Sequence, residues 1–240
     1  MSALLEIAVF NIESALLAAA SGSDRLELCE NPYDGGTTPS YGFLKNVSEL
    51  ISIPVFPIIR PRGGDFIYSN AEFKQICYDI DLCKDLGFKG VVSGMLLENG
   101  TIDHKRTAQL VALSGAMHFT FHRAFDRAMN PLQALETIID TGAKRILTSG
   151  QVPNAFDGKE LIQQLVQQSG SRIIIMPGSG VRSNNIKALQ TFTVAQEFHS
   201  SARLTVKSSM QFHPDSMNET IVNTLVDASE IMKMKAQLMQ

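Results

Sequence analysis

The feature of this sequence that most constrains its fold is a regular alternation of short β-branched runs with longer amphipathic stretches. Such alternation is typical of repeated β-α units whose strands form a parallel sheet. We count eight units, with room for one helix between each pair of strands. The expected strands cover residues 4–9, 25–29, 55–60, 90–93, 118–122, 145–149, 172–176 and 195–199.

Three junctions between these units favour a closed barrel. Gly22, Gly87 and Gly142 each stand just before an expected strand, where Gly can end a helix in the left-handed conformation. The helices that end there would cover 16–20, 73–86 and 134–139. A doubly wound open sheet would use the same junctions, but the Gly-x-Gly-x-x-Gly of a dinucleotide-binding sheet does not follow the first strand. The sequence therefore predicts an α/β fold, a (β/α)8 TIM barrel.

Chain length and composition predict one domain. A chain of 240 residues with 44% hydrophobic content can bury one sizeable core, and no linker or low-complexity segment divides it. We therefore expect a single domain over 1–240. The least regular stretch, about 203–215, is expected to be a loop before a terminal helix near 218–235.

Charge and cysteine content limit the class of partner and the compartment. The formal net charge is −3, with acids and bases interspersed, which indicates neither a nucleic-acid footprint nor an anionic membrane surface as partner. Small molecules are the expected ligands. The first residues lack a basic segment followed by a long apolar run, and the three cysteines suit a reducing compartment. The expected location is the cytoplasm.

Charged and imidazole side chains recur on the expected strands. Side chains alternate between the two faces of a strand, so Glu27 and Cys29 point inward if Leu26 and Leu28 face the helices. Active groups of such barrels gather at the carboxyl ends of the strands. The same reasoning for the other strands gives five candidate catalytic residues converging on one mouth: Glu6, Glu27, Arg60, His122 and His199.

This constellation has two interpretations. Acids, a base and imidazoles together can transfer protons or bind a metal. Alternatively, Glu6, Glu27 and Arg60 form a satisfied ion-pair network that braces the barrel, because isolated buried charges are costly. The two histidines at strand ends favour a functional role for His122 and His199.

Small residues after the last two strands predict an anion site. Barrels often bind phosphate in these loops, where backbone N–H groups can approach an anion. The candidates are Gly178, Ser179, Gly180, Ser200 and Ser201. A tight turn that needs Gly for its backbone conformation is the alternative. Arg62, in the loop 60–66, is a further candidate as part of a substrate clamp or lid, and a solvated turn is the competing interpretation.

Read together, these segments resemble the CutC family of copper-homeostasis proteins. The most specific motifs are Arg-Pro-Arg-Gly-Gly-Asp-Phe at 60–66 and His-Arg-Ala-Phe-Asp at 122–126. Shorter matches lie at 5–7, 25–29, 35–40, 147–150, 178–182 and 199–201. The resemblance covers roughly the first 200 residues, in order. It implies a cytoplasmic barrel that forms a homodimer and binds copper ion, but it does not imply a particular reaction.

The resemblance and the residues leave two hypotheses. Copper(I) prefers sulfur ligands, and where family members often carry cysteine in the first strand this chain has Ala8 and Val9. Cys29 is then the expected metal ligand, with His122 or His199 as co-ligand. The other hypothesis is an enzyme or binding protein for a small phosphorylated or carboxylated metabolite. Its general acid/base would be Glu27 or His122, and Arg60 would stabilise negative charge.

Overall fold

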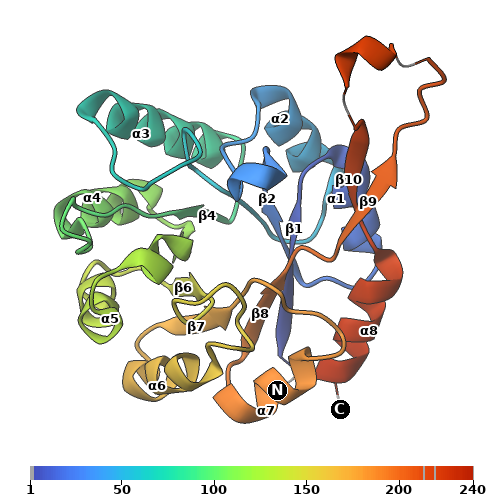
Figure 1. Ribbon diagram of the computed structural model, residues 1–240. Helices are drawn as coiled ribbons and strands as arrows, with labels where there is room; N and C mark the ends of the chain where they lie inside the picture. Colours follow the sequence, from blue (N-terminus) through green and yellow to red (C-terminus); the bar gives the residue numbers. More distant parts are fainter. Residues whose placement is uncertain (1–2, 213, 219, 240) are drawn as a thin grey trace.

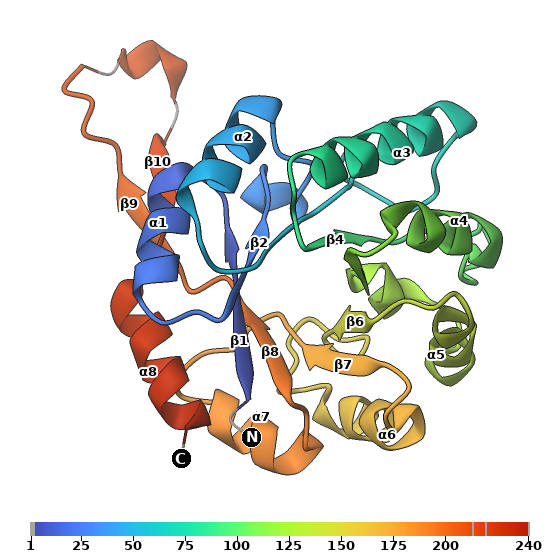
Figure 2. The same ribbon diagram turned by 180° about the vertical axis from the view of Figure 1, so that it is seen from behind.

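Eight parallel strands surrounded by helices form the body of the protein in a computed structural model that describes residues 3–212, 214–218 and 220–239 (Figures 1 and 2). The strands are β1 Leu4–Val9, β2 Arg25–Leu28, β3 Val55–Pro57, β4 Gly90–Ser93, β5 His118–Phe121, β6 Arg145–Thr148, β7 Ile174–Pro177 and β8 Glu197–Ser200. Each expected strand is present within two residues of its expected start. The predicted TIM barrel is therefore confirmed.

The helices lie on the outside of this ring. In the described part of the chain they are α1 Ile12–Ala20, α2 Tyr41–Leu50, α3 Asn70–Asp85, α4 His104–Ser114, α5 Pro131–Asp140, α6 Lys159–Ser169, α7 Ile186–Thr193 and α8 Ala228–Leu238. Gly22, Gly87 and Gly142 have φ of 94°, 79° and 82°, the left-handed conformation expected before β2, β4 and β6.

The strands are hydrogen-bonded in two groups of four, ordered β3-β2-β1-β8 and β4-β5-β6-β7. A parallel bridge between Ile58 and Val92 joins the groups at one side, and β7 lies beside β8 at the other. The register puts Glu6 of β1 opposite Arg25 of β2 and opposite His199 of β8. Three charged side chains thus meet at one level inside the barrel.

The main hydrophobic core lies between the strands and the helices. Alternate strand residues such as Leu5, Ile7, Leu26 and Phe119 are buried there, and one apolar cluster extends from Ala3 to Leu238. Among the described residues, none of the helices combines the length and apolar character needed to cross a bilayer. The single-domain organisation over 1–240 stays a prediction.

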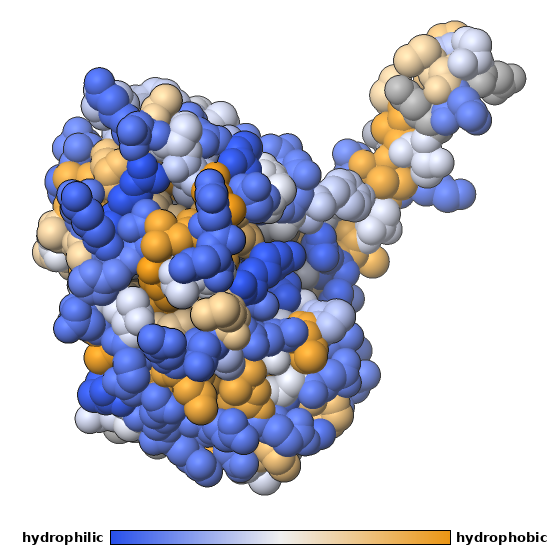
Figure 3. All heavy atoms as spheres, turned by 60° about the vertical axis from the view of Figure 1, so that its left-hand side comes forward, coloured by the Kyte–Doolittle hydropathy of each residue, from blue (hydrophilic) through white to orange (hydrophobic). Residues whose placement is uncertain are grey.

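The C-terminal part differs from expectation. Instead of a loop over 203–215 and a helix near 218–235, β9 Arg203–Lys207 pairs antiparallel with β10 Val222–Val226. The two strands form an arm that projects from the barrel (Figures 1 and 3). Helix α8 starts only at Ala228, because Asp227 accepts hydrogen bonds from the N–H groups of Ser229 and Glu230 and caps its first turn. Residues 213 and 219 lie outside the described part.

Candidate functional site

A cavity of about 370 Å³ opens at the carboxyl ends of the strands, where active sites of such barrels occur. Its walls come from the ends of β2, β3, β5, β6, β7 and β8 and from the loops that follow them. The lining residues that carry polar side chains are Glu27, Arg60, His122, Arg123, Asn154, Ser179, Arg182, His199, Ser200, Ser201 and Arg203.

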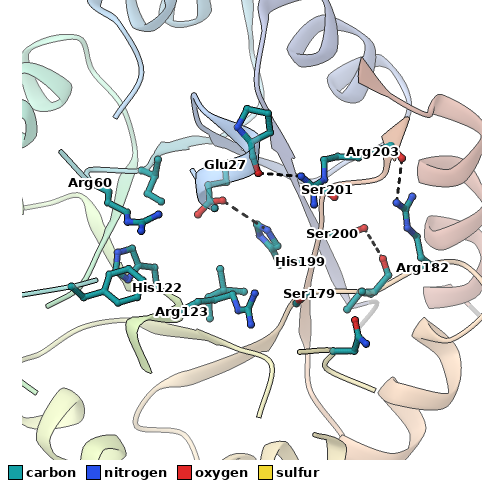
Figure 4. A pocket seen from close by; sticks show the side chains of 18 residues that line it. Glu27, Arg60, His122, Arg123, Ser179, Arg182, His199, Ser200, Ser201 and Arg203 are labelled. Carbon is teal, nitrogen blue, oxygen red and sulfur yellow. Dashed lines mark hydrogen bonds and ion pairs between the residues drawn. The ribbon is translucent and has the colours of Figure 1, made fainter. Parts of the chain in front are cut away.

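His199 and Glu27 form the floor, and together with Glu6 they make a row of two carboxyl groups and an imidazole. His199 Nδ1 lies 2.8 Å from Glu6 Oε1, and His199 Nε2 lies 3.8 Å from Glu27 Oε2 (Figure 4). Glu6 is fully buried and lies behind His199, so the cavity is lined by His199 and Glu27 but not by Glu6. Glu27 Oε2 accepts a hydrogen bond from the Cys29 thiol at 3.3 Å, and Glu27 Oε1 is buried without a partner among the described residues.

The pKa values of this row are shifted in different directions. Burial opposes ionisation of Glu6, but the guanidinium of Arg25 and the hydrogen bond with His199 outweigh it and hold the pKa of Glu6 well below its usual range. Burial raises the pKa of Glu27, although the charge of His199 opposes this. Burial would lower the pKa of His199, but the carboxyl groups of Glu27 and Glu6 raise it. The pKa of Glu6 is therefore lowered, whereas the pKa values of Glu27 and His199 are both raised.

A layer of ion pairs lies beneath the row. Arg25 donates hydrogen bonds to Glu6 and to Glu197, and Arg145 binds both carboxylate oxygens of Glu197. The guanidinium groups of Arg25 and Arg145 also lie 4.8 and 5.6 Å from the centre of the Phe56 ring. This part of the barrel is an ion-pair network of Arg25, Arg145, Glu6 and Glu197. Of the three residues in the second interpretation of the sequence, it contains Glu6 but neither Glu27 nor Arg60.

The turn after β5 presents His122 to the cavity. His122 Nδ1 accepts a hydrogen bond from the N–H of Ala124 at 3.2 Å, so the ring proton resides on Nε2. His122 Nε2 is buried and lacks a partner among the residues described. Burial, assisted by the charge of Arg60, lowers the pKa of His122 to about 3. His122 is therefore a neutral hydrogen-bond donor at physiological pH.

Arg60 at the end of β3 holds neighbouring loops together. Its Nη1 donates to the carbonyl groups of Asp34 and Gly36 at 2.5 and 3.0 Å, and its Nη2 donates to the carbonyl of Gly64 at 2.9 Å. Arg60 Nε is buried and lacks a partner in the described structure. The residue therefore both organises the rim and leaves one donor available.

The loops after β7 and β8 form the opposite rim. Ser179 and Gly180 have φ of 82° and 69°, so two successive residues are left-handed and their backbone turns sharply. Across the described chain, the N–H groups of Ser179, Gly180, Val181 and Ser201 make no hydrogen bond. Ser200 Oγ donates to the carbonyl of Val181 at 2.7 Å and ties the two loops together. Unpartnered N–H groups in such a turn are typical of anion sites.

The structure brings most of the candidate residues to one cavity. Those lining it are Glu27, Arg60, His122, His199, Ser179, Gly180, Ser200 and Ser201. Gly178 packs instead against Leu147 and His199, where an added Cβ would lie 2.4 Å from Leu147 Cδ1. Arg62 points away, because it donates to Glu72 at 2.6 Å and to Asp65 at 3.1 Å.

Sequence reasoning missed several polar residues of this region. Arg25 shares the inward face of β2 with Glu27, two positions away, so strand alternation could have identified it. Arg123, Asn154 and Arg203 lie on loops, where no periodicity indicates direction.

Comparisons with known proteins agree with this architecture. The sequence profile described as the CutC family matches residues 3–204. The chain belongs to the CutC family. A CutC relative from Chromobacterium violaceum is 47% identical over 88% of this chain and 86% of its own length. A CutC relative from Salmonella typhi is 47% identical over 90% of this chain and 83% of its own length. The chain is also similar to the crystal structure of a protein from Streptococcus agalactiae that is named as a putative copper homeostasis protein, CutC. The two are 30% identical and superpose with a TM-score of 0.79, and the match covers 83% of this chain and 98% of the other.

The donor atoms in this CutC chain suit a cation that prefers oxygen and nitrogen better than copper(I). Within the described residues, the group of three or more His, Cys, Asp or Glu donors close enough to share an ion is Glu6, Glu27 and His199, which contains no sulfur. Cys29 lies beside Glu27, but burial and the Glu27 charge raise the pKa of its thiol well above the usual range. Cys77 and Cys83 lie on α3 in the outer layer. These residues fit a specific copper(I) site poorly.

Proposed function

We propose that this protein binds a small phosphorylated metabolite in the cavity and transfers a proton to or from it. One observation carries the proposal: one rim of the cavity has N–H donors, and its floor has the carboxyl group of Glu27, for which the described residues supply no partner at those N–H groups or at Oε1. Unpaired buried polar groups are costly, so a ligand that satisfies them gains affinity.

The rim after β7 and β8 supports binding of the phosphate. The unpartnered N–H groups of Ser179, Gly180, Val181 and Ser201 provide donors, and Arg182 and Arg203 line the same end. Among the described residues, neither arginine forms an ion pair with a carboxylate. Their charges are thus available to a dianion.

The floor supports proton transfer. Burial raises the pKa of Glu27, and its Oε1 lacks a partner among the described residues, which suits a general acid/base. His199 is oriented by Glu6, and the carboxyl groups of Glu27 and Glu6 raise its pKa, which favours the imidazolium form that would stabilise negative charge on the ligand. His122, with its pKa of about 3, serves as a hydrogen-bond donor and not as the acid/base that the sequence allowed.

Inorganic phosphate tests the binding proposal. Isothermal titration calorimetry at fixed ionic strength should detect phosphate binding, and Arg203→Gln should weaken it about tenfold or more. Arg172→Gln is the matched control, because Arg172 is exposed and pairs with Glu136 far from the cavity. Equal phosphate affinity of wild type and Arg203→Gln would argue against the site.

The proton-transfer proposal needs the metabolite itself. Acid release from the purified protein and mass spectrometry would identify it, and nuclear magnetic resonance in D₂O would follow hydrogen exchange. Glu27→Gln should retain phosphate binding and abolish the exchange. Undiminished exchange in Glu27→Gln would exclude Glu27 as the base.

Copper ion binding is the second candidate, supported by the copper-homeostasis name of the relative from Streptococcus agalactiae and by the nearness of Cys29, Glu27 and His199. Anaerobic copper(I) titration of wild type and Cys29→Ala tests it. A large loss of affinity in Cys29→Ala would support a specific site at this sulfur. Weak binding that is unchanged by the substitution would exclude one.

We also propose a homodimer in the cytoplasm. The arm exposes apolar side chains that a second copy could cover: Leu204 on β9, and Met210, Phe212 and Met217 in the connection between β9 and β10 (Figure 3). The three free cysteines suit a reducing compartment. Light scattering after size-exclusion chromatography tests the dimer, and Leu204→Asp with Phe212→Asp should shift it toward monomer.

A further inference from the structure

The cavity has a second end, opposite the rim that follows β7 and β8. Figure 4 shows Arg60, His122 and Arg123 together on one side of the Glu27 and His199 pair, with Ser201 and Arg182 on the other. A ligand that reaches across the floor from the phosphate rim therefore meets this second group of donors.

Arg60 is a buried cation without a counter-ion. Only 4% of the residue is exposed, and its hydrogen bonds go to backbone carbonyl groups. No Asp or Glu of the described residues forms an ion pair with it, unlike the nearby Arg25 and Arg145. Carbonyl groups satisfy N–H donors but supply no net negative charge, so a charge of this kind is costly until an anion approaches.

His122 adds a second unpartnered donor next to Arg60. The centre of the Phe66 ring lies 4.9 Å from the centre of the His122 ring and 4.8 Å from the Arg60 guanidinium carbon, so both side chains contact the same phenyl group. Arg60 Nε and His122 Nε2 are both buried and unpartnered within the described part of the protein. Two buried N–H groups that lack partners there thus belong to residues that line the same wall of the cavity.

Arg123 supplies a third donor and is held firmly. Its Nε donates to Asp126 at 2.7 Å and its Nη2 donates to Ser149 at 2.8 Å. Asp126 is itself fixed by hydrogen bonds from Thr148 Oγ1 and from the N–H of Ser149 at 2.5 and 3.0 Å. Arg123 lines the cavity, and its Nη1 has no hydrogen-bond partner in the described chain. Asp126 is a positioning residue for this guanidinium.

We propose that this second end binds a carboxylate, so that the ligand carries a phosphate at one end and a carboxyl group at the other. The inference rests on the proposed function and narrows its substrate class to phosphorylated carboxylic acids. A carboxylate supplies the charge that Arg60 lacks, and its two oxygens accept the N–H groups of Arg60, His122 and Arg123. A hydroxyl or carbonyl group would satisfy the donors but leave the charge unbalanced.

A matched pair of probes tests this inference. 3-Phosphoglycerate and glycerol 3-phosphate differ by a carboxylate in place of a hydroxymethyl group, and inorganic phosphate reports on the first end alone. Calorimetry at fixed ionic strength should show 3-phosphoglycerate binding about tenfold tighter than glycerol 3-phosphate. Arg123→Gln should remove most of this preference and leave the affinity for inorganic phosphate within about twofold.

Two variants separate the ends of the cavity. Arg203→Gln should lower the affinity for all three probes by a similar factor, and Arg172→Gln should leave all three affinities unchanged. Equal affinity for the two organic probes, with phosphate binding intact, overturns the carboxylate inference and leaves the phosphate site standing. Failure of inorganic phosphate to bind overturns both. Arg123→Gln keeps Arg60 in place, so the loops that Arg60 holds stay folded in the test.

Discussion

The ion-pair layer beneath the cavity makes a strong prediction about stability. Glu197 is 8% exposed, accepts a hydrogen bond from Arg25 at 2.6 Å and binds Arg145 through both carboxylate oxygens. Glu197→Gln preserves the shape of the side chain but leaves the two buried guanidinium groups with Glu6 as their one counter-ion among the described residues. Removing one partner of a buried ion pair costs about 3–5 kcal/mol. For a chain of this size the midpoint of thermal unfolding should fall by about 6–20 °C.

Urea unfolding at pH 7, followed by circular dichroism, measures this cost. Glu136→Gln is the control, because Glu136 also binds an arginine through both oxygens, but Glu136 and Arg172 are 45% and 46% exposed. Such an exposed pair contributes at most about 1 kcal/mol. A loss in Glu197→Gln no greater than the loss in Glu136→Gln would refute the reasoning.

The pH dependence of this difference has a definite sign. Burial acts to raise the pKa of Glu197, but Arg145 and Arg25 outweigh it and lower the pKa below the ordinary value of 4.5. A carboxyl group whose pKa is lower in the folded state stabilises the fold above its unfolded pKa. The advantage of wild type over Glu197→Gln should therefore be complete above about pH 4.5 and shrink as pH falls further.

Three further predictions concern single groups. Glu6→Gln should lower the pKa of His199 in an NMR titration, because a hydrogen bond and a negative charge are lost; an unchanged midpoint would contradict the arrangement. Nitrogen-15 spectra should show His122 as the neutral Nε2–H tautomer down to about pH 4, since its pKa is about 3; protonation near pH 6 would contradict this. The buried Cys29 thiol should react with Ellman's reagent only after denaturation, and rapid reaction of the native protein would show that it is accessible.

The sequence predicted the barrel and much of its inward face. Strand alternation placed Glu27 and His199 on the interior side, and both line the cavity. Glu6 shares that face but not the cavity, because the register puts it level with His199 and behind its ring. Alternation predicts which face of the sheet a strand residue occupies. Its position along the barrel axis depends instead on the register with the neighbouring strands.

Loops and the C-terminal arm were harder to predict. Arg62 and Arg60 are two residues apart in one motif, yet they lie in different places. Arg62 donates a hydrogen bond to Glu72 outside the cavity. Arg60 lines the cavity and donates hydrogen bonds to the carbonyl groups of Asp34 and Gly36. The arm was expected to be loop and helix, but it forms because β9 pairs with β10, whose first residue is 15 positions beyond the last residue of β9. The contacts that decide both cases join residues too far apart to leave a local periodic pattern.

The sequence by itself determined the eight β-α units, the order of the strands and the inward direction of Glu27, His122 and His199. These properties follow from side-chain alternation and helix ends, which are set by near neighbours in the chain. Only the tertiary structure decided which charges neutralise each other and which are left for a ligand. Arg25 pairs with Glu6 and Glu197, whereas the hydrogen bonds of the Arg60 guanidinium within the described residues go to carbonyl groups. Closure of the barrel sets those distances, and electrostatic pairing depends on distance rather than on position in the sequence.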